Sequence, residues 1–290
     1  MPRYSDTDET LNNQQTNYRI PLETTVLDAV SDDHINHYRE HGYVAVEGFI
    51  EGENLETWRR VTDEAVAERL ASAEELTNQK KNEDPSYYSR VFVQCLRLAD
   101  TNDEMRGLIY DERIGRIAAT LEGIDGIRVW HDQALIKQPY GNPTGWHLDN
   151  PYWSFSSRNA ISIWIALDDA TLENGCLYYV PGSHKTATFE TTGIGDNIGE
   201  LFDVYPEWKE IDPVPAPVPA GTAVFHNGLT AHGAGANMTR HARRAMTCAF
   251  MPDGATFNGN QNVLPQEYFE SLTEGDVLDD EGQNPLVWRA

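Results

Sequence analysis

The sequence predicts a mainly β protein with flanking α-helices, built as a sandwich or barrel. After Gly126, short segments rich in β-branched and aromatic residues recur, each bounded by Gly, Pro or Asn, which is the pattern of strands joined by turns. Before Gly126, apolar residues recur at helical spacing instead. Repeated short strands with turn signals indicate a sandwich or a barrel.

The N-terminal segment is expected to form helices around one short strand. Ser31 can cap a first helix, because its hydroxyl accepts from free N–H groups, and Gly42 can end that helix in the left-handed conformation. Further on, Leu55, Trp58 and Val61 recur at the spacing of a long amphipathic helix. The expected elements are a helix over 31–42, a strand over 43–46, a helix over 53–75, and short helices over 103–109 and 112–121.

Strands, an insert and a tail are expected after residue 126. The strands are predicted at 127–130, 134–137, 161–167, 176–180, 223–226 and 245–251. An insert over 186–220 is long enough to be unusual unless it is functional, and we interpret it as a lid. The acidic, weakly patterned tail over 257–290 allows helix or loop. We therefore expect a flexible lead-in over 1–30 and one domain over 31–290, with its core at 127–254.

Charge and composition exclude several classes of partner. With 46 acidic and 22 basic residues the net charge is −24, which argues against nucleic acid or an anionic membrane. No apolar run of about 18 residues predicts a membrane span. The cysteines are scattered and odd in number, which favours reduced thiols, and the N-terminus shows no secretory signal, so we expect a cytoplasmic protein. We expect it to be a monomer or a homodimer. Only five basic residues are lysines, which also fits a salt-adapted surface.

The triplet His147-Leu148-Asp149, followed at a distance by His232, is the most informative motif. In a β-strand, residues i and i+2 point to the same face, so His147 and Asp149 can aim at one point. Two imidazoles and one carboxylate on one face of a metal form the facial triad of non-haem Fe(II) oxygenases. His226 is the alternative second histidine. The other histidines are expected to be structural: His34, His37, His41, His131, His184 and His241.

The residues around this triplet belong to a longer series. Its segments are 145–153, 161–170, 173–177, 180–185 and 232–237, with Arg243 eleven residues after His232. The series resembles the phytanoyl-CoA dioxygenase family of Fe(II)- and 2-oxoglutarate-dependent oxygenases, over residues 31 to 254. The resemblance implies a double-stranded β-helix, a jelly-roll and cupin-like core, and it selects His232 over His226 as the second histidine ligand.

The resemblance also implies roles for residues outside the triad. Arg243 would bind the far carboxylate of 2-oxoglutarate, because a guanidinium stays charged and binds a carboxylate through two hydrogen bonds. Arg244, which faces the other way on a strand, is the alternative. Trp164 would pack against the co-substrate or serve as an ordinary core aromatic. Gln133 and Lys137 would give polar contacts to 2-oxoglutarate or substrate.

Three residues directly after the metal motif are candidates for substrate contact. They are Asn150, Tyr152 and Trp153. Aromatic side chains at these positions can equally pack the mouth of the barrel, so both interpretations stay open.

The sequence thus favours a dioxygenase that uses Fe(II), 2-oxoglutarate and O₂ to hydroxylate a C–H bond of a small metabolite, releasing succinate and CO₂. His147, Asp149 and His232 would be its catalytic metal ligands. Hydroxylation is favoured because Asp149 is retained, whereas relatives that lack this carboxylate halogenate. The alternatives are a non-catalytic jelly-roll protein that binds a metal or ligand, and a cupin-like metalloenzyme that does not use 2-oxoglutarate. The cupin alternative leaves Arg243 without a purpose.

Overall fold

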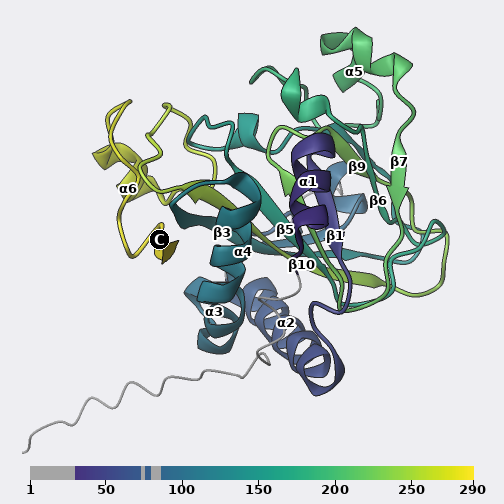
Figure 1. Cartoon of the computed structure of the whole chain (residues 1–290). Helices are drawn as coiled ribbons and strands as arrows, with labels where there is room; N and C mark the ends of the chain where they lie inside the picture. The colour runs from purple at the N-terminus through teal and green to yellow at the C-terminus, as the bar shows by residue number, and fades with distance from the viewer. Residues whose placement is uncertain (1–29, 73–75, 80–85) are drawn as a thin grey trace, which may run out of the picture.

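Two antiparallel β-sheets packed face to face form the centre of the computed structural model, which describes residues 30–72, 76–79 and 86–290 (Figure 1). Within these residues the larger sheet has the order β1 (Tyr43–Val46), β8 (Ala223–Asn227), β5 (Ile161–Ala166), β10 (Arg243–Pro252), β3 (Gly126–Lys137) and β11 (Leu286–Arg289), with β2 (Val93–Leu96) paired to β3. The smaller sheet has the order β4 (Thr144–His147), β9 (His232–Ala234), β6 (Leu177–Tyr179) and β7 (Val214–Ala216). The predicted fold class is confirmed.

The N-terminal helices cover the outer face of the larger sheet. These helices are α1 (Asp32–His41), α2 (Gly52–Ser72), α3 (Asp103–Ile109) and α4 (Glu112–Glu122). The predicted caps of α1 are present: the Ser31 hydroxyl accepts from the His34 N–H, and Gly42 has a φ of 84°. Apolar residues of all four helices share one core with the outward side chains of the sheet, so the prediction of helices before residue 126 is confirmed.

Strand alternation decides which side chains face the space between the sheets. On β5, Ile161, Ile163 and Ile165 pack into the core beneath the helices, whereas Trp164 and Ala166 pack toward the smaller sheet. The same alternation holds on β10, and on β3 up to His131, where the register between the two strands shifts between Ala249 and Phe250 and Trp130 has no partner on β10. Polar residues at inward positions of these central strands therefore line the space between the sheets.

The predicted strands at 127–130 and 134–137 are one strand, β3. The polar residues 131–133 between the two predicted ranges also belong to this strand. His131 and Gln133 face the inner space, and Asp132 on the opposite face accepts from the backbone N–H groups of Leu98 and Ala99. Asp132 and Gln133 thus have hydrogen-bond partners, whereas no described residue pairs with Nδ1 of His131.

The insert and the tail have more secondary structure than the sequence indicates. The insert contains α5 (Leu201–Val204), the 3-10 helix η7 (Pro206–Glu210) and β7, which joins the smaller sheet. The tail contains α6 (Gln266–Ser271) and β11, which pairs with β3. The remaining 3-10 helices are η3 (Tyr88–Arg90), η4 (Leu98–Asp100), η5 (Asn150–Tyr152) and η6 (Ser183–Lys185).

Two expectations from composition can be compared with the structure, and one cannot. Cys95, Cys176 and Cys248 are buried and form no disulfide. Among the described residues, no helix combines the length and apolar character needed to cross a bilayer. The lead-in expected over 1–30 lies, except for Val30, outside the described residues.

Candidate metal centre and its cavity

Pairing of two short strands brings the two histidines of the motif together. His147 is the last residue of β4, His232 is the first residue of β9, and the two lie opposite each other in the ladder. Their ring centroids are 4.1 Å apart. Oδ1 of Asp149 lies 3.6 Å from Nε2 of His147 and 3.7 Å from Nε2 of His232. The three potential ligand atoms all lie within 4.8 Å of one another, so these residues can hold a single metal ion. His147, Asp149 and His232 are called here the metal cluster.

Backbone carbonyls fix the orientation of both rings. Nδ1 of His147 is 2.9 Å from the Gly145 carbonyl oxygen, and Nδ1 of His232 is 3.0 Å from that of Thr230. A carbonyl can only accept, so each Nδ1 carries the proton and each Nε2 is left with a free lone pair. Burial, and after it the neighbouring His147, holds the pKa of His232 well below its usual value. His232 is therefore a neutral imidazole, the form that binds metals.

Asp149 reaches the cluster from a turn, so the expectation that His147 and Asp149 share a strand is wrong. Asp149 follows the end of β4 and has helical backbone angles at the start of η5. The backbone N–H groups of Asp149 and Asn150 both donate to the Gly228 carbonyl, at 3.0 and 2.9 Å. These two bonds hold the turn, which directs the carboxylate back toward the histidines.

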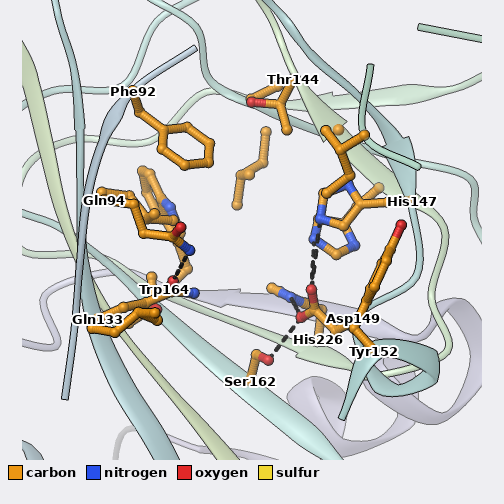
Figure 2. Close-up of a pocket in the computed structure, with 18 of the residues that line it drawn as sticks. Phe92, Gln94, Gln133, Thr144, His147, Asp149, Tyr152, Ser162, Trp164 and His226 are labelled. Atoms are coloured by element: carbon orange, nitrogen blue, oxygen red, sulfur yellow. Dashed lines mark hydrogen bonds and ion pairs between the residues drawn. The ribbon is translucent and has the colours of Figure 1, made fainter. Parts of the chain in front are cut away.

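The second oxygen of Asp149 has partners of its own, as Figure 2 shows. Oδ2 accepts from the Ser162 hydroxyl at 2.9 Å and lies 3.2 Å from Nε2 of His226, whose Nδ1 is 3.1 Å from the Tyr179 hydroxyl. His226 therefore contacts the oxygen that points away from the other histidines. Burial opposes ionisation of Asp149, yet His232 and its other histidine neighbours hold the pKa of this carboxyl well below its usual range.

Arg243 is a buried cation that contacts no counter-ion among the described residues. Arg243 is the first residue of β10, and its side chain points to the inner face of the sheet. The residue is 2% exposed and lines the same cavity as the metal cluster. No described residue accepts a hydrogen bond from Nε or Nη1, and the guanidinium lies 5.0 Å from the Trp164 ring centroid. Burial lowers the pKa of Arg243 to about 10, so it is still charged at neutral pH. Unpaired donors on a buried guanidinium indicate a site for an external anion.

Arg244 faces the opposite way, as strand alternation requires. Its Nη2 donates to Asp168 at 2.7 Å and its Nη1 to Asp63 of α2, also at 2.7 Å. With both carboxylates as partners, Arg244 is a structural cation on the helix side of the sheet. This geometry favours Arg243 over Arg244 as the residue for an anionic ligand.

The metal cluster and Arg243 open onto one cavity of about 460 Å³ between the sheets. Of the residues singled out from the sequence, Gln133, Trp164, Tyr152 and Trp153 also line this cavity. Figure 2 shows Gln133 on the side opposite His147, Asp149 and Tyr152.

Two of the candidate residues are buried elsewhere. The Lys137 ammonium, whose pKa burial and then Arg243 lower to about 7, donates to the Asn142 carbonyl at 2.8 Å. The Asn150 amide donates to the Phe155 carbonyl and accepts from the Ser157 N–H. In this structure both side chains stabilise turns, and a direct role for either in ligand binding stays a prediction.

Several cavity residues could not be found from the sequence. Gln94 and Leu96 come from β2 and Phe92 directly precedes it, Ile194 comes from the insert, and Asn262 and Val263 come from the tail. These segments show no motif or clear periodicity, and only the tertiary fold brings them together. His131, expected to be structural, also lines the cavity. The one available signal was its alternation with Gln133 on β3.

Comparison with known proteins gives the chain its family. The family model described as phytanoyl-CoA dioxygenase (PhyH) matches residues 38–245, which include the metal cluster and Arg243. The chain belongs to the phytanoyl-CoA dioxygenase family. That family lies within the iron- and 2-oxoglutarate-dependent oxygenase superfamily, so the resemblance inferred from the motifs is confirmed.

Individual relatives agree with this assignment. Dioxygenase lolE1 of Epichloe uncinata is 33% identical over 150 residues, which are 52% of this chain and 56% of that protein. Among solved structures, the non-heme alpha ketoglutarate dependent carbocyclase SnoK has a TM-score of 0.75 and 28% identity, over 90% of this chain and 97% of its own. The two-sheet core is thus the double-stranded β-helix expected from the sequence.

A solved complex shows which cofactors such a fold holds. The epimerase SnoN, with a TM-score of 0.69 and 25% identity over 91% of this chain and all of its own, was solved with Fe³⁺ and alpha ketoglutarate. Iron and 2-oxoglutarate are thus the cofactors of structural relatives, and this chain has the corresponding His-Asp-His cluster.

Proposed function

We propose that this protein is an Fe(II)- and 2-oxoglutarate-dependent dioxygenase that oxidises a C–H bond of a small metabolite, with hydroxylation as the outcome. His147, Asp149 and His232 would hold the iron. Arg243, supported by Trp164, would bind the far carboxylate of 2-oxoglutarate. When bound, iron and 2-oxoglutarate supply the oxidising chemistry, in which O₂ is consumed and succinate and CO₂ are released.

The unpaired guanidinium of Arg243 is the observation that carries this proposal. Arg243 is 2% exposed, and no described residue accepts a hydrogen bond from its Nε or Nη1. Burying such a cation destabilises the fold unless a ligand supplies the missing acceptors. A dicarboxylate that also reaches the metal would supply that acceptor. A cupin-like metalloenzyme that does not use 2-oxoglutarate would leave this cation unpaired. A non-catalytic binding protein would not require the metal site and Arg243 to share a cavity.

The residues of the chain contribute positioning and a dry environment. The carbonyls of Gly145 and Thr230 orient the histidine rings, and Ser162 and His226 hold the second oxygen of Asp149. The aromatic walls of the cavity keep water from the reacting C–H bond. Hydroxylation is proposed over other outcomes because Asp149 keeps its carboxylate at the metal, although relatives include a carbocyclase and an epimerase.

The test is succinate formation by the Fe(II)-loaded protein in a screen of small metabolites. We expect succinate above the metabolite-free background with the correct substrate, and a hydroxylated product. Asp149→Ala should abolish the hydroxylated product, because one of the three metal ligands is lost. The exposed Asp212→Ala should behave as wild type. Near-normal turnover in Asp149→Ala would show that the triad is misassigned.

A further inference from the structure

One part of the cavity is lined by residues that the proposed function assigns neither to iron nor to 2-oxoglutarate. This part, called here the substrate chamber, is lined by Phe92, just before β2, by Gln94 of β2, by His131 and Gln133 of β3, and by Tyr152 and Trp153 after the metal motif. Ile194 of the insert and Asn262 of the tail close its rim. Phe92 and Tyr152 lie on opposite sides of the cavity in Figure 2.

The rim of the substrate chamber is fixed by hydrogen bonds. The Tyr152 hydroxyl donates to the Thr192 carbonyl and so ties the insert to the metal motif. Nη1 of Arg97 donates to the Val263 carbonyl at 3.2 Å, while its Nε donates to Asp100 at 2.6 Å. The insert and the tail are therefore held in position before any substrate binds, and the chamber is largely preformed.

The chamber has no formal charge to offer a ligand. Among the described residues that line the whole cavity, only Asp149 and Arg243 carry a formal charge, apart from the histidines. In the proposed function both are committed, to the metal and to 2-oxoglutarate. Burial lowers the pKa of His131 to about 4, so its imidazole is uncharged at neutral pH. A carboxylate, phosphate or ammonium group in the chamber would be buried without a partner.

The chamber instead offers aromatic faces and an amide pair. Nε2 of Gln94 donates to Oε1 of Gln133 at 2.6 Å. This bond fixes both amides and leaves the Gln133 N–H groups without an acceptor in the part of the chain that the structure describes. Aromatic rings favour flat apolar bodies, while a fixed amide favours a carbonyl or hydroxyl oxygen on the ligand.

We propose that the substrate is an uncharged molecule with a flat, aromatic or polycyclic apolar body and oxygen-bearing groups, and that the enzyme discriminates against substrates with a carboxylate, phosphate or ammonium near the reacting carbon. The proposal rests on the proposed function, because it assigns Asp149 and Arg243 to the cofactors. The proposal also disfavours coenzyme A thioesters as substrates, because the net charge of −24 would repel their phosphates.

Three probes of one shape and different charge test this proposal. They are 2-naphthylmethanol, 2-naphthoate and 2-naphthylmethylamine, measured by equilibrium dialysis against the full chain loaded with Fe(II) and 2-oxoglutarate under nitrogen. We expect the alcohol to bind at least about 10-fold more tightly than either charged probe, because the charge of the acid or the amine would be buried in the chamber without a partner. Equal or tighter binding of the acid or the amine, or no binding of the alcohol, would overturn the proposal.

A charge introduced into the chamber adds a second test. Gln94→Glu replaces the amide that donates to Oε1 of Gln133 with a carboxylate, to which the Gln133 amide can donate after turning over. The substitution introduces an anion, so the amine should gain about 10-fold in affinity while the acid loses affinity. Gln266→Glu, on the exposed face of α6, is the matched control and should keep the wild-type order. An unchanged order in folded Gln94→Glu would contradict the proposal. Because binding under nitrogen needs no turnover, absence of succinate formation in air would count against the proposed function alone.

Discussion

At the residue scale, the two oxygens of Asp149 have different tasks. Oδ1 faces the histidine Nε2 atoms, whereas Oδ2 is held by Ser162 and His226. With Nδ1 of His226 accepting from the Tyr179 hydroxyl, its Nε2 carries the proton and donates to Oδ2. His226, which competed with His232 as a ligand at the level of sequence, is therefore interpreted as a positioning residue.

Removing this support should weaken the metal site without unfolding the protein. His226→Leu is expected to lower metal affinity by about 10–100-fold, the usual effect of losing an outer hydrogen bond to a ligand. His226→Gln should retain part of the affinity, since an amide can donate to Oδ2. The measurement is Co(II) titration of the metal-free protein, with its melting temperature checked. The exposed His241→Gln is the control, and unchanged affinity in His226→Leu would contradict the positioning role.

At the scale of elements, a buried carboxyl joins α1, α4 and β8. Glu122, the last residue of α4, accepts from the Tyr38 hydroxyl of α1 and from the Asn227 amide of β8, the latter at 2.8 Å. Burial raises the pKa of Glu122 to about 7, although Tyr38, Asn227 and Asn159 partly offset that effect. The junction is therefore most stable when Glu122 is protonated.

This junction gives stability a predictable pH dependence. The pKa of Glu122 is higher in the folded than in the unfolded chain, so the folded state binds more protons between pH of about 4.5 and 7. Stability should fall as pH rises through that window and level off above it. Glu122→Gln, which stays neutral, should lose this part of the dependence and gain on wild type from pH 5 to pH 8, as melting temperatures would show. The exposed Glu53→Gln should follow wild type. If the melting temperature of Glu122→Gln depended on pH in the same way as that of wild type, Glu122 would not be the group responsible.

The elements that could not be predicted from the sequence are short. The long amphipathic helix, the caps of α1 and the apolar strands β5 and β10 follow from local patterns. Strands such as β7 and β9 have three residues each and exist because a partner strand supplies their hydrogen bonds. Asp149 was assigned to the correct cluster for an incomplete reason, since a turn held by Gly228 directs it there and not strand alternation.

At the scale of the whole molecule, the motif residues and the cavity have different origins. His147 and Asp149 could be predicted from the His-Leu-Asp triplet, and His232 and Arg243 from the resemblance to the family. The walls of the cavity could not, since β2, the insert and the tail come together only in the folded chain. Residues such as Gln94 and Asn262 show no local signal of a binding role.

The charge of the whole chain leads to a prediction about salt. With 46 acidic and 22 basic residues, like-charge repulsion opposes the compact state and salt relieves it. If the surface is salt-adapted, the melting temperature should keep rising with KCl into the molar range, beyond the range in which Debye screening alone acts. A melting temperature that is flat from low to molar KCl would leave an ordinary acidic protein as the better description.

The central claim is that the metal cluster and Arg243 bind one 2-oxoglutarate between them, and anaerobic calorimetric titration of the Fe(II)-loaded chain with 2-oxoglutarate tests it most directly. Leaving a buried carboxylate unpaired costs roughly 3–5 kcal/mol. Arg243→Ala should therefore raise the dissociation constant by about two to three orders of magnitude, at about 1.4 kcal/mol per tenfold. Arg244→Ala, on the helix side of the sheet, should change it far less. Equal effects of the two substitutions, or tight binding that survives loss of both Fe(II) and Arg243, would contradict the account.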